Sequence, residues 1–224
     1  PKYGADATRW YMIANAAPWD NLKFDLDGIT EVQRKLFGTL YNTYGFFSLY
    51  SNVDNFVVDH SNAVPMAERG ELDKWIISKL NSLVKDVTTA FDENEPHRAA
   101  RYIEEFVDEH LSNWYIRLSR RRFWKGEMSI DKKAAYETLH ECLTVVGQLM
   151  SPIAPFFADW LFKNLTVNDA KAEESVHLTL FKKADEKLID KGLEERMEMA
   201  QRISSMVLSI RKKENLRVRQ PLQR

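Results

Sequence analysis

The chain is poor in several residue types, and each shortage excludes a class of protein. One cysteine, Cys142, among 224 residues excludes an intramolecular disulfide framework and a cysteine-rich zinc site. Eight glycines and seven prolines are too few for collagen, a low-complexity chain or a turn-rich β-sandwich. No apolar run approaches the roughly 18 residues of a membrane span, and no signal-peptide pattern is present. We therefore expect a cytoplasmic protein without a membrane partner.

The formal net charge is only −1, but the charges are distributed unevenly along the chain. Residues 92–109 carry seven acids and two arginines, a balance of −5 (2 − 7). Residues 111–126 carry five cations and no acid, and residues 209–224 carry six cations and one acid. A protein with little net charge can still hold a polyanion on one basic face. The two basic regions are candidates for such a face.

The spacing of apolar residues predicts a chain that is mainly helical. The clearest case is residues 72–91, where Leu72, Trp75 and Ile76 begin the i, i+3, i+4 pattern of an amphipathic helix. The same pattern predicts further helices over residues 3–17, 30–52, 96–125, 131–150, 152–165 and 186–214. In residues 175–181, apolar and polar residues instead alternate as in a short strand. The predicted fold is an all-α antiparallel bundle with this one extended segment.

A run of arginines and aromatic residues between Asn113 and Trp124 is the sharpest feature of the sequence. Trp114 and Leu118 continue the apolar stripe of the predicted helix, which turns the nearby arginines toward its other faces. RNA would supply phosphates for arginine and unstacked bases for stacking. The candidate residues are Arg117, Arg120, Arg121 and Arg122. The alternative is a helix end whose cations suit the helix dipole and pair with the acids of residues 92–109.

A second basic group lies at the end of the last predicted helix and beyond it. Its members are Arg211, Lys212, Lys213, Arg217 and Arg219. Such a group can track the phosphates of a nucleic acid. It can equally be the solvated end of a helix.

Few residues suggest catalysis or metal binding. Glu137 and His140 form a Glu-x-x-His pair, which di-metal bundles use twice together with two further carboxylates. A second such pair, Glu174 and His177, falls in the extended segment, where residues three apart point to opposite faces. We therefore interpret both pairs as surface residues and Cys142 as a buried, inert thiol. Phosphate loops and protease motifs are absent, so nothing in these 224 residues argues for catalysis.

Several separated motifs resemble the isoleucyl-tRNA synthetase family and follow the order that this family has. Residues 113–117 (Asn-Trp-Tyr-Ile-Arg) and 120–124 (Arg-Arg-Arg-Phe-Trp) resemble the signature of its anticodon-binding helical domain. Residues 3–11 and 19–24 resemble the segment that follows the family's Lys-Met-Ser-Lys loop. Further similar segments are residues 151–156, 175–178 and 218–222. The resemblance covers nearly the whole chain.

The resemblance implies a domain organisation and a partner. Residues 1–28 would end the connector that follows the catalytic loop, residues 29–214 would form the anticodon-binding bundle, and residues 215–224 would begin a C-terminal region. The bundle would hold the anticodon stem and loop of isoleucine tRNA. Its contacts to phosphates and bases would come from Arg117, Arg120, Arg121 and Arg122, with Trp124 as a stacking plane and Lys212, Lys213, Arg217 and Arg219 as weaker candidates for the RNA backbone.

The catalytic parts of the family are not found in these residues. The His-x-x-His motif, the Lys-Met-Ser-Lys loop and the inserted editing domain have no counterpart in the sequence. We therefore expect a piece of a longer, monomeric isoleucine-tRNA ligase whose catalytic and editing domains belong to the same parent chain. ATP and Mg²⁺ are expected only for that full-length enzyme, and no cofactor is expected for this piece.

Three other interpretations stay open at this point. The first is the corresponding domain of a valyl- or leucyl-tRNA synthetase, since these families share the bundle. The second is a helical protein-interaction module, which would show no salt-dependent RNA binding. The third is a carboxylate metalloenzyme, which would contain bound metal.

Overall fold

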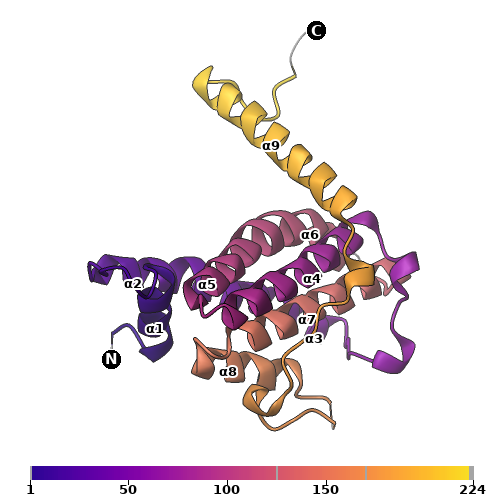
Figure 1. Ribbon diagram of the computed structural model, residues 1–224. Helices are drawn as coiled ribbons and strands as arrows, with labels where there is room; N and C mark the ends of the chain where they lie inside the picture. The colour runs from indigo at the N-terminus through magenta and orange to yellow at the C-terminus, as the bar shows by residue number, and fades with distance from the viewer. Residues whose placement is uncertain (1, 125, 170, 222–224) are drawn as a thin grey trace. The chain divides into compact units, whose positions relative to one another are not determined.

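The chain forms two compact units, Pro1–Ile189 and Asp190–Arg224, and each is described by itself. The basic residue Lys125 and residues 222–224 of the expected C-terminal region lie outside the described part of the chain. The computed structural model describes residues 2–124, 126–169 and 171–221 (Figure 1).

The described residues are helical and contain no strand, which confirms the predicted all-α fold class. The α-helices are α1 (Ala5–Ala14), α2 (Leu26–Val32), α3 (Gly38–Val53), α4 (Glu71–Asp92), α5 (Pro96–Glu105), α6 (Arg117–Trp124), α7 (Ile130–Met150), α8 (Pro155–Leu165) and α9 (Lys191–Lys213). Two π-helical segments, Gln33–Phe37 and Phe106–Ile116, continue α2 into α3 and α5 into α6 without a break.

The helix α4 follows directly from its apolar spacing and from the residues at its end. Trp75 and Ile76 are buried, as the amphipathic pattern requires. Asn94 ends the helix in the left-handed conformation (φ 59°), and the amide of the next residue, Glu95, donates to the carbonyl of Ala90 at 2.8 Å. This arrangement satisfies carbonyls that the helix end would otherwise leave unpaired. The helix predicted over residues 72–91 is therefore confirmed.

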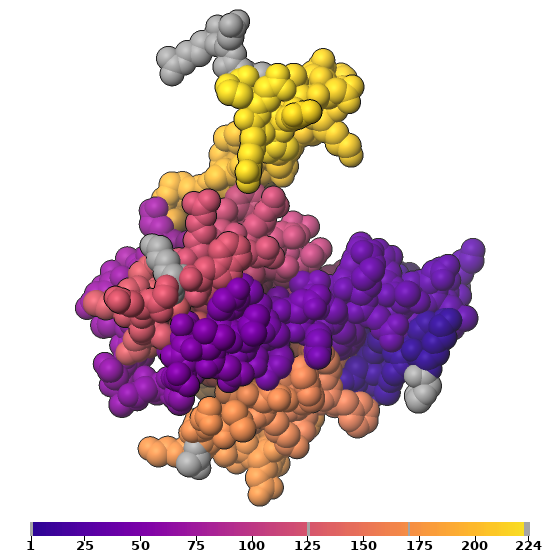
Figure 2. Space-filling model, turned by 180° about the vertical axis from the view of Figure 1, so that it is seen from behind, coloured from indigo at the N-terminus to yellow at the C-terminus, as the bar shows by residue number. Residues whose placement is uncertain are grey.

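The helix α7 lies at the centre of the first unit. It contacts α3, α4, α6 and α8, and Figure 2 shows α3 (violet) on one face of this unit beside α8 (orange). The hydroxyl of Ser129 accepts a hydrogen bond from the amide of Lys132 and so caps the first turn. Cys142 is fully buried on this helix, and burial raises the pKa of its thiol well above the ordinary value. The prediction that this thiol is buried is confirmed, and a raised pKa is in keeping with the low reactivity that we expect for it.

The helix α1 holds the junction between α7 and α8 through two charged side chains. The carboxylate of Asp6 accepts a hydrogen bond from the amide of Phe157 at 2.6 Å, in the first turn of α8. The guanidinium of Arg9 donates to the carbonyl of Ile153 at 2.9 Å, just before that turn. An anion at a helix N-terminus is stabilised by the helix dipole. Residues 151–153 form turns between α7 and α8. The helix α8 therefore begins at Pro155, three residues later than predicted.

The strand-like pattern of residues 175–181 does not produce an extended segment throughout. Val176–Leu178 form one 3₁₀ turn, in which the hydroxyl of Ser175 accepts from the amide of His177. Leu180 is 91% exposed, so the apolar side of the alternation is not buried. The pattern was misleading because the described residues contain no partner strand, and the backbone closes a local turn instead.

The last helix is shorter than predicted, and the apolar stripe expected on it is exposed. It begins at Lys191 rather than at residue 186, because the side chain of Asp190 caps it by accepting from the amide of Leu193 at 2.9 Å. Its expected apolar stripe includes Ile203 and Ile210, which are 50% and 60% exposed. The second unit therefore does not bury this stripe by itself.

The glycine at position 28 allows α1 and α2 to approach closely. A Cβ atom at Gly28 would lie 2.3 Å from the Cε2 atom of Tyr11. The Tyr11 ring cannot swing aside freely, since its hydroxyl donates to the carbonyl of Lys23 and accepts from the amide of Asp25. We expect Gly28→Ala to lower the free energy of unfolding by about 1–3 kcal/mol, the usual cost of overpacking. Urea unfolding followed by circular dichroism measures this change.

A second helical glycine provides the control. A Cβ atom at Gly45, in the middle of α3, meets nothing within 4 Å. Gly45→Ala is expected to raise stability by about 0.5–1 kcal/mol, because alanine loses less backbone entropy than glycine in a helix. Equal effects of the two substitutions would show that Tyr11 does not limit the space at Gly28.

Candidate nucleic-acid interface

The helix α6 carries the arginine run, and a π-helical segment sets its rotation. The prediction that Leu118 continues the buried stripe is wrong, since Leu118 is 53% exposed, and Trp114 is only partly buried. Tyr115, Ser119 and Phe123 are buried in their place. The reason is Phe106–Ile116, where i→i+5 hydrogen bonds widen the turns and shift the face that meets the core.

This rotation places three arginines and one tryptophan outside. Arg117, Arg120 and Arg121 are exposed, and Trp124, one turn further on, is 56% exposed. Residues three and four apart share a helix face, so these side chains form one surface. We call Arg117, Arg120, Arg121 and Trp124 the arginine face.

Within the described residues, the arginines of the arginine face have no ion-pair partner. Glu104, one of the acids that the alternative interpretation paired with them, instead accepts from the indole of Trp10 at 2.7 Å. Three unpaired cations on one helix face are a site to which a polyanion is attracted.

Arg122 points the other way and is held inside the protein. Its guanidinium donates to both carboxylate oxygens of Asp73 on α4, at 2.8 and 2.7 Å. It also donates to the carbonyl of Asp131 at 2.8 Å and pairs with the carboxylate of that residue at 2.9 Å. With its side chain only 15% exposed, Arg122 differs from the other arginines of the run.

The carboxylate of Asp73 is completely buried and is shared between two partners. Besides Arg122 it accepts a hydrogen bond from the hydroxyl of Tyr115 at 2.7 Å. Burial, and then the charge of Asp73, raise the pKa of Tyr115 well above its ordinary value. Burial by itself would lower the pKa of the Arg122 guanidinium. The hydrogen bonds to Asp73 outweigh this effect, so the pKa is raised above its ordinary value. The tyrosine therefore remains protonated and the arginine charged at any ordinary pH.

The second basic group lies in the second unit, at the end of α9. Lys212, Lys213, Arg217 and Arg219 are all exposed. The guanidinium of Arg211 donates to the carbonyl of Arg217 at 2.8 Å and to that of Gln220 at 3.0 Å. These hydrogen bonds tie the backbone of residues 217–220 to the end of the helix.

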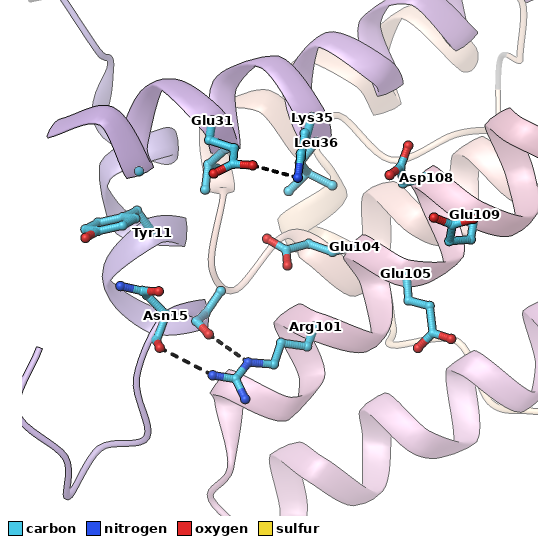
Figure 3. Close-up of a pocket in the computed structure, with 13 residues that line it drawn as sticks. Tyr11, Asn15, Glu31, Lys35, Leu36, Arg101, Glu104, Glu105, Asp108 and Glu109 are labelled. Carbon is cyan, nitrogen blue, oxygen red and sulfur yellow. Dashed lines mark hydrogen bonds and ion pairs between the residues drawn. The ribbon is translucent and has the colours of Figure 1, made fainter. Parts of the chain in front are cut away.

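A cleft between α2 and α5 has the opposite charge (Figure 3). Its volume is about 560 Å³. Five carboxylates line it, whereas its two cations are already engaged: Lys35 pairs with Glu31 at 2.6 Å, and Arg101 donates to the carbonyl of Ala14 at 2.9 Å. The carboxylates are those of Glu31, Glu104, Glu105, Asp108 and Glu109. With five carboxylates and two cations, the lining has a formal charge of −3 (2 − 5), which disfavours a phosphate group in this cleft.

The Glu-x-x-His pairs are placed differently from one another. Glu174 and His177 are exposed, as predicted. The prediction is wrong for Glu137 and His140, which are only 7% and 8% exposed on α7. The spacing gave no sign of this, because a Glu-x-x-His pair looks the same on a buried helix face as on the surface.

The described residues offer neither a cluster of metal-binding side chains nor a membrane-spanning helix. No cluster of three or more histidine, cysteine, aspartate or glutamate side chains that could hold a metal ion occurs among them. None of their helices combines the length and the apolar character that crossing a bilayer requires.

Comparisons with known proteins agree on one family. A family model described as the anticodon-binding domain of tRNA ligase matches residues 73–224. The isoleucine–tRNA ligase of Cytophaga hutchinsonii is 60% identical over 224 residues, which are 100% of this chain and 20% of that protein. The isoleucine–tRNA ligase of Bacteroides thetaiotaomicron is 57% identical over 223 residues, 99% of this chain and 19% of that protein. The chain thus spans about a fifth of the length of these curated relatives.

A solved structure shares the fold at low sequence identity. It is the LeuRS agnB2 of Agrobacterium radiobacter K84, crystallised as a ternary complex with tRNA and LeuAMS. The TM-score is 0.57 and the identity 14%, over 84% of this chain and 20% of that chain. At this identity the likeness concerns the fold of the helical bundle.

The buried ion pair generates a stability prediction. We expect Asp73→Asn to lower the free energy of unfolding by about 3–5 kcal/mol, because it removes the buried carboxylate and leaves Arg122 only its pair with the exposed Asp131. The double variant Asp73→Leu with Arg122→Met removes both charges and is expected to be less destabilised than Asp73→Asn. Chemical unfolding of the three proteins measures the difference.

A surface ion pair is the control for this experiment. The Glu31–Lys35 pair has a similarly short distance, but both side chains are 55% exposed. Glu31→Gln should leave the unfolding midpoint unchanged within error, because solvent screens exposed pairs. If Asp73→Asn were as mild as Glu31→Gln, the buried pair would not hold α6 in place.

Proposed function

The chain belongs to the family of anticodon-binding domains of tRNA ligases, and on that premise we propose that it binds tRNA through the arginine face of α6. The observation that carries this proposal is the set of three exposed arginines that form no ion pair with any described residue, beside the exposed ring of Trp124. Arginine forms bidentate hydrogen bonds with phosphate. Unstacked bases of an RNA loop stack on aromatic rings. An anticodon stem-loop offers both groups.

The electrostatic pattern favours one side of the first unit for the RNA. The acidic cleft between α2 and α5 would repel the phosphate backbone, so the stem-loop has to approach α6 from elsewhere. Arg122 does not take part in this contact. It positions the helix through Asp73 and leaves phosphate binding to Arg117, Arg120 and Arg121.

The exposed group at the end of α9 is the second proposed contact. Lys212, Lys213, Arg217 and Arg219 would track the RNA backbone and add affinity without reading bases.

Residues 1–28 would belong to the connector that precedes the bundle, and residues 215–224 to the following C-terminal region.

The parent protein that we propose is an isoleucine-tRNA ligase. Relatives with this name are 60% and 57% identical over nearly the whole chain, whereas the LeuRS structure is 14% identical and supports the fold alone. The partner would be isoleucine tRNA. Activation of isoleucine with ATP and Mg²⁺ would be carried out by catalytic residues elsewhere in a monomeric, cytoplasmic parent chain, together with its editing domain.

A charge-reversal variant tests the phosphate contacts. Arg120→Glu with Arg121→Glu should weaken binding of isoleucine tRNA at least tenfold at low salt. Each lost phosphate contact should lower the slope of log K against log salt by about 0.7–0.9. A filter-binding or fluorescence titration over a salt series measures both quantities.

The matched control is Lys183→Glu, an equal charge change per residue at an exposed lysine outside α6. It should change the affinity much less and leave the slope nearly unaltered. Unchanged affinity and slope in a folded Arg120/Arg121 variant would contradict the proposal. They would favour the alternative of a helical protein-interaction module.

Trp124 is expected to contribute in a different way from the arginines. Trp124→Ala should weaken tRNA binding by an amount equivalent to about 1–3 kcal/mol, the usual contribution of one stacked base. The salt slope should remain as in the unmodified chain, because no charge is removed. The same titration separates this effect from that of the arginines.

Phe156→Ala is the control, since Phe156 is also strongly exposed, at 70%, but lies on α8. It should bind tRNA like the unmodified chain. If both aromatic substitutions had the same effect, Trp124 would not be a specific stacking plane.

A further inference from the structure

The ring of Trp124 is exposed, and its place depends on the helical turn that carries it. Trp124 is the last residue of α6 and is 56% exposed. Its ring contacts no other aromatic ring of the described residues. The ends of helices fray unless tertiary contacts hold them. The contacts of the two preceding residues, Arg122 and Phe123, therefore decide where the Trp124 ring lies.

Phe123 occupies an aromatic slot whose two walls are Phe46 of α3 and Tyr136 of α7. The Phe123 side chain is buried, at 1% exposed. Its ring meets that of Phe46 edge to face, with the centroids 5.0 Å apart, and that of Tyr136 in the same way at 4.8 Å. The end of α6 (pink) and α3 (violet) are thus neighbours on the face that Figure 2 shows. Edge-to-face pairs have a preferred geometry, so the slot fixes the direction of Phe123 as well as its depth.

The Tyr136 wall of the slot is held by both its ring and its hydroxyl. The ring is completely buried and stacks on that of Phe56, with the centroids 4.6 Å apart. The hydroxyl donates to the carboxylate of Asp54, which also pairs with the buried ammonium of Lys132 at 2.6 Å. Burial, and then the hydrogen bond to Asp54, raise the pKa of Tyr136, so the hydroxyl keeps its proton. Phe46 is apolar and only partly buried, so this wall can be changed without leaving a buried polar group unpaired.

Two successive side chains therefore hold the last turn of α6 from different sides. Arg122 is bound by Asp73 of α4 and Asp131 of α7, whereas Phe123 lies in the slot between α3 and α7. Successive residues of a helix are about 100° apart around its axis, so the two contacts together oppose both rotation and fraying of this turn. Trp124 follows directly and points outward. A ring that is already in place loses less conformational freedom when a base stacks on it.

We propose that Phe46 and Tyr136 position Trp124 for stacking, because they hold Phe123 and with it the last turn of α6. This role rests on the proposed function, in which Trp124 stacks on a base of the RNA loop. The residues of the slot influence RNA affinity through Trp124 and do not touch the RNA themselves. The phosphate contacts of the exposed arginines do not need the slot, because their long side chains can reach a phosphate from several positions of the backbone.

Two neighbouring residues of α3 provide a matched pair of variants. Phe46→Leu removes one wall of the slot. Phe47 is more deeply buried, at 7% exposed, and its ring contacts those of Tyr136 and His140. It has no ring contact with Phe123 among the described residues. Phe47→Leu should therefore lower the thermal stability at least as much as Phe46→Leu, but leave the slot in place.

Titration of the 224-residue chain with isoleucine tRNA separates positioning from stability. Phe46→Leu should weaken binding by about threefold to tenfold, which is part of the loss expected when the stacking ring is removed altogether. The salt slope should stay the same, because no charge changes. In the Trp124→Ala background, Phe46→Leu should weaken binding no further, since no ring is left to position. Phe47→Leu should bind tRNA like the unmodified chain, although it is less stable.

Amide hydrogen exchange tests the slot without any RNA. The amides in the last turn of α6 should exchange faster in Phe46→Leu than in Phe47→Leu, because only the first variant loosens this turn. The measurement is made at a temperature at which thermal unfolding shows that both variants are folded. Equal exchange in the two variants would mean that Phe46 does not hold the end of α6.

The possible outcomes distinguish this role from the proposed function. A loss of tRNA affinity in Phe46→Leu that disappears in the Trp124→Ala background, with faster exchange in the last turn of α6, supports the positioning role. Normal binding by Phe46→Leu, the same loss in both backgrounds, or an equal loss in Phe47→Leu overturns it and leaves the stacking by Trp124 intact. If Trp124→Ala itself left tRNA binding unchanged, the stacking and the positioning role would both be wrong.

Discussion

The buried carboxylate of Asp73 fixes how α6 is rotated, and with it which arginines reach the solvent. It receives two hydrogen bonds from Arg122 and one from Tyr115. Arg122 also reaches Asp131 in the first turn of α7. One carboxylate thus joins α4, the π-helical segment, α6 and α7. A buried ion pair of this kind adds little net stability compared with an apolar pair, but it permits few alternative arrangements.

The π-helical segment and this ion pair depend on each other. An uninterrupted α-helix over residues 96–124 would bury Trp114 and Leu118, as the apolar pattern predicts. The wider turns of Phe106–Ile116 shift the core face by about one residue, so that Tyr115 reaches Asp73. Arg122 follows to the inside, and the arginine face remains outside. The irregular helix therefore determines which of the clustered arginines are available to a ligand.

The sequence was a good guide where one face of a helix is apolar and a poor guide where contacts are distant. The helices α4 and α7 have their predicted bounds within one residue, because their apolar residues follow helical spacing over the whole length of each helix. The partner of Arg122 lies 49 residues upstream, and no local pattern reveals it. The burial of Glu137 and His140 was missed for the same reason, since Arg69 and the carbonyl of Leu165 lie in other segments. Exposure of the basic residues near the end of α9 followed from their charge alone.

The helical stretch from α5 to α6 also explains how three arginines can stay unpaired in the folded chain. Its acids lie in the first part, on α5 and the π-helical segment, together with Arg98 and Arg101, whereas the three unpaired arginines lie in the last turns, where the described residues have no acid. Cations near a helix C-terminus are stabilised by the helix dipole, by about 0.3–1 kcal/mol each at exposed positions. This effect offsets part of the mutual repulsion within the arginine face. The interpretation of these cations as a dipole-stabilised helix end and the proposal of an RNA-binding surface are therefore compatible. The helix dipole and the buried pair of Asp73 and Arg122 stabilise the end of the helix. Arg117, Arg120 and Arg121 are therefore not needed for an internal ion pair and are available to a phosphate under our proposal.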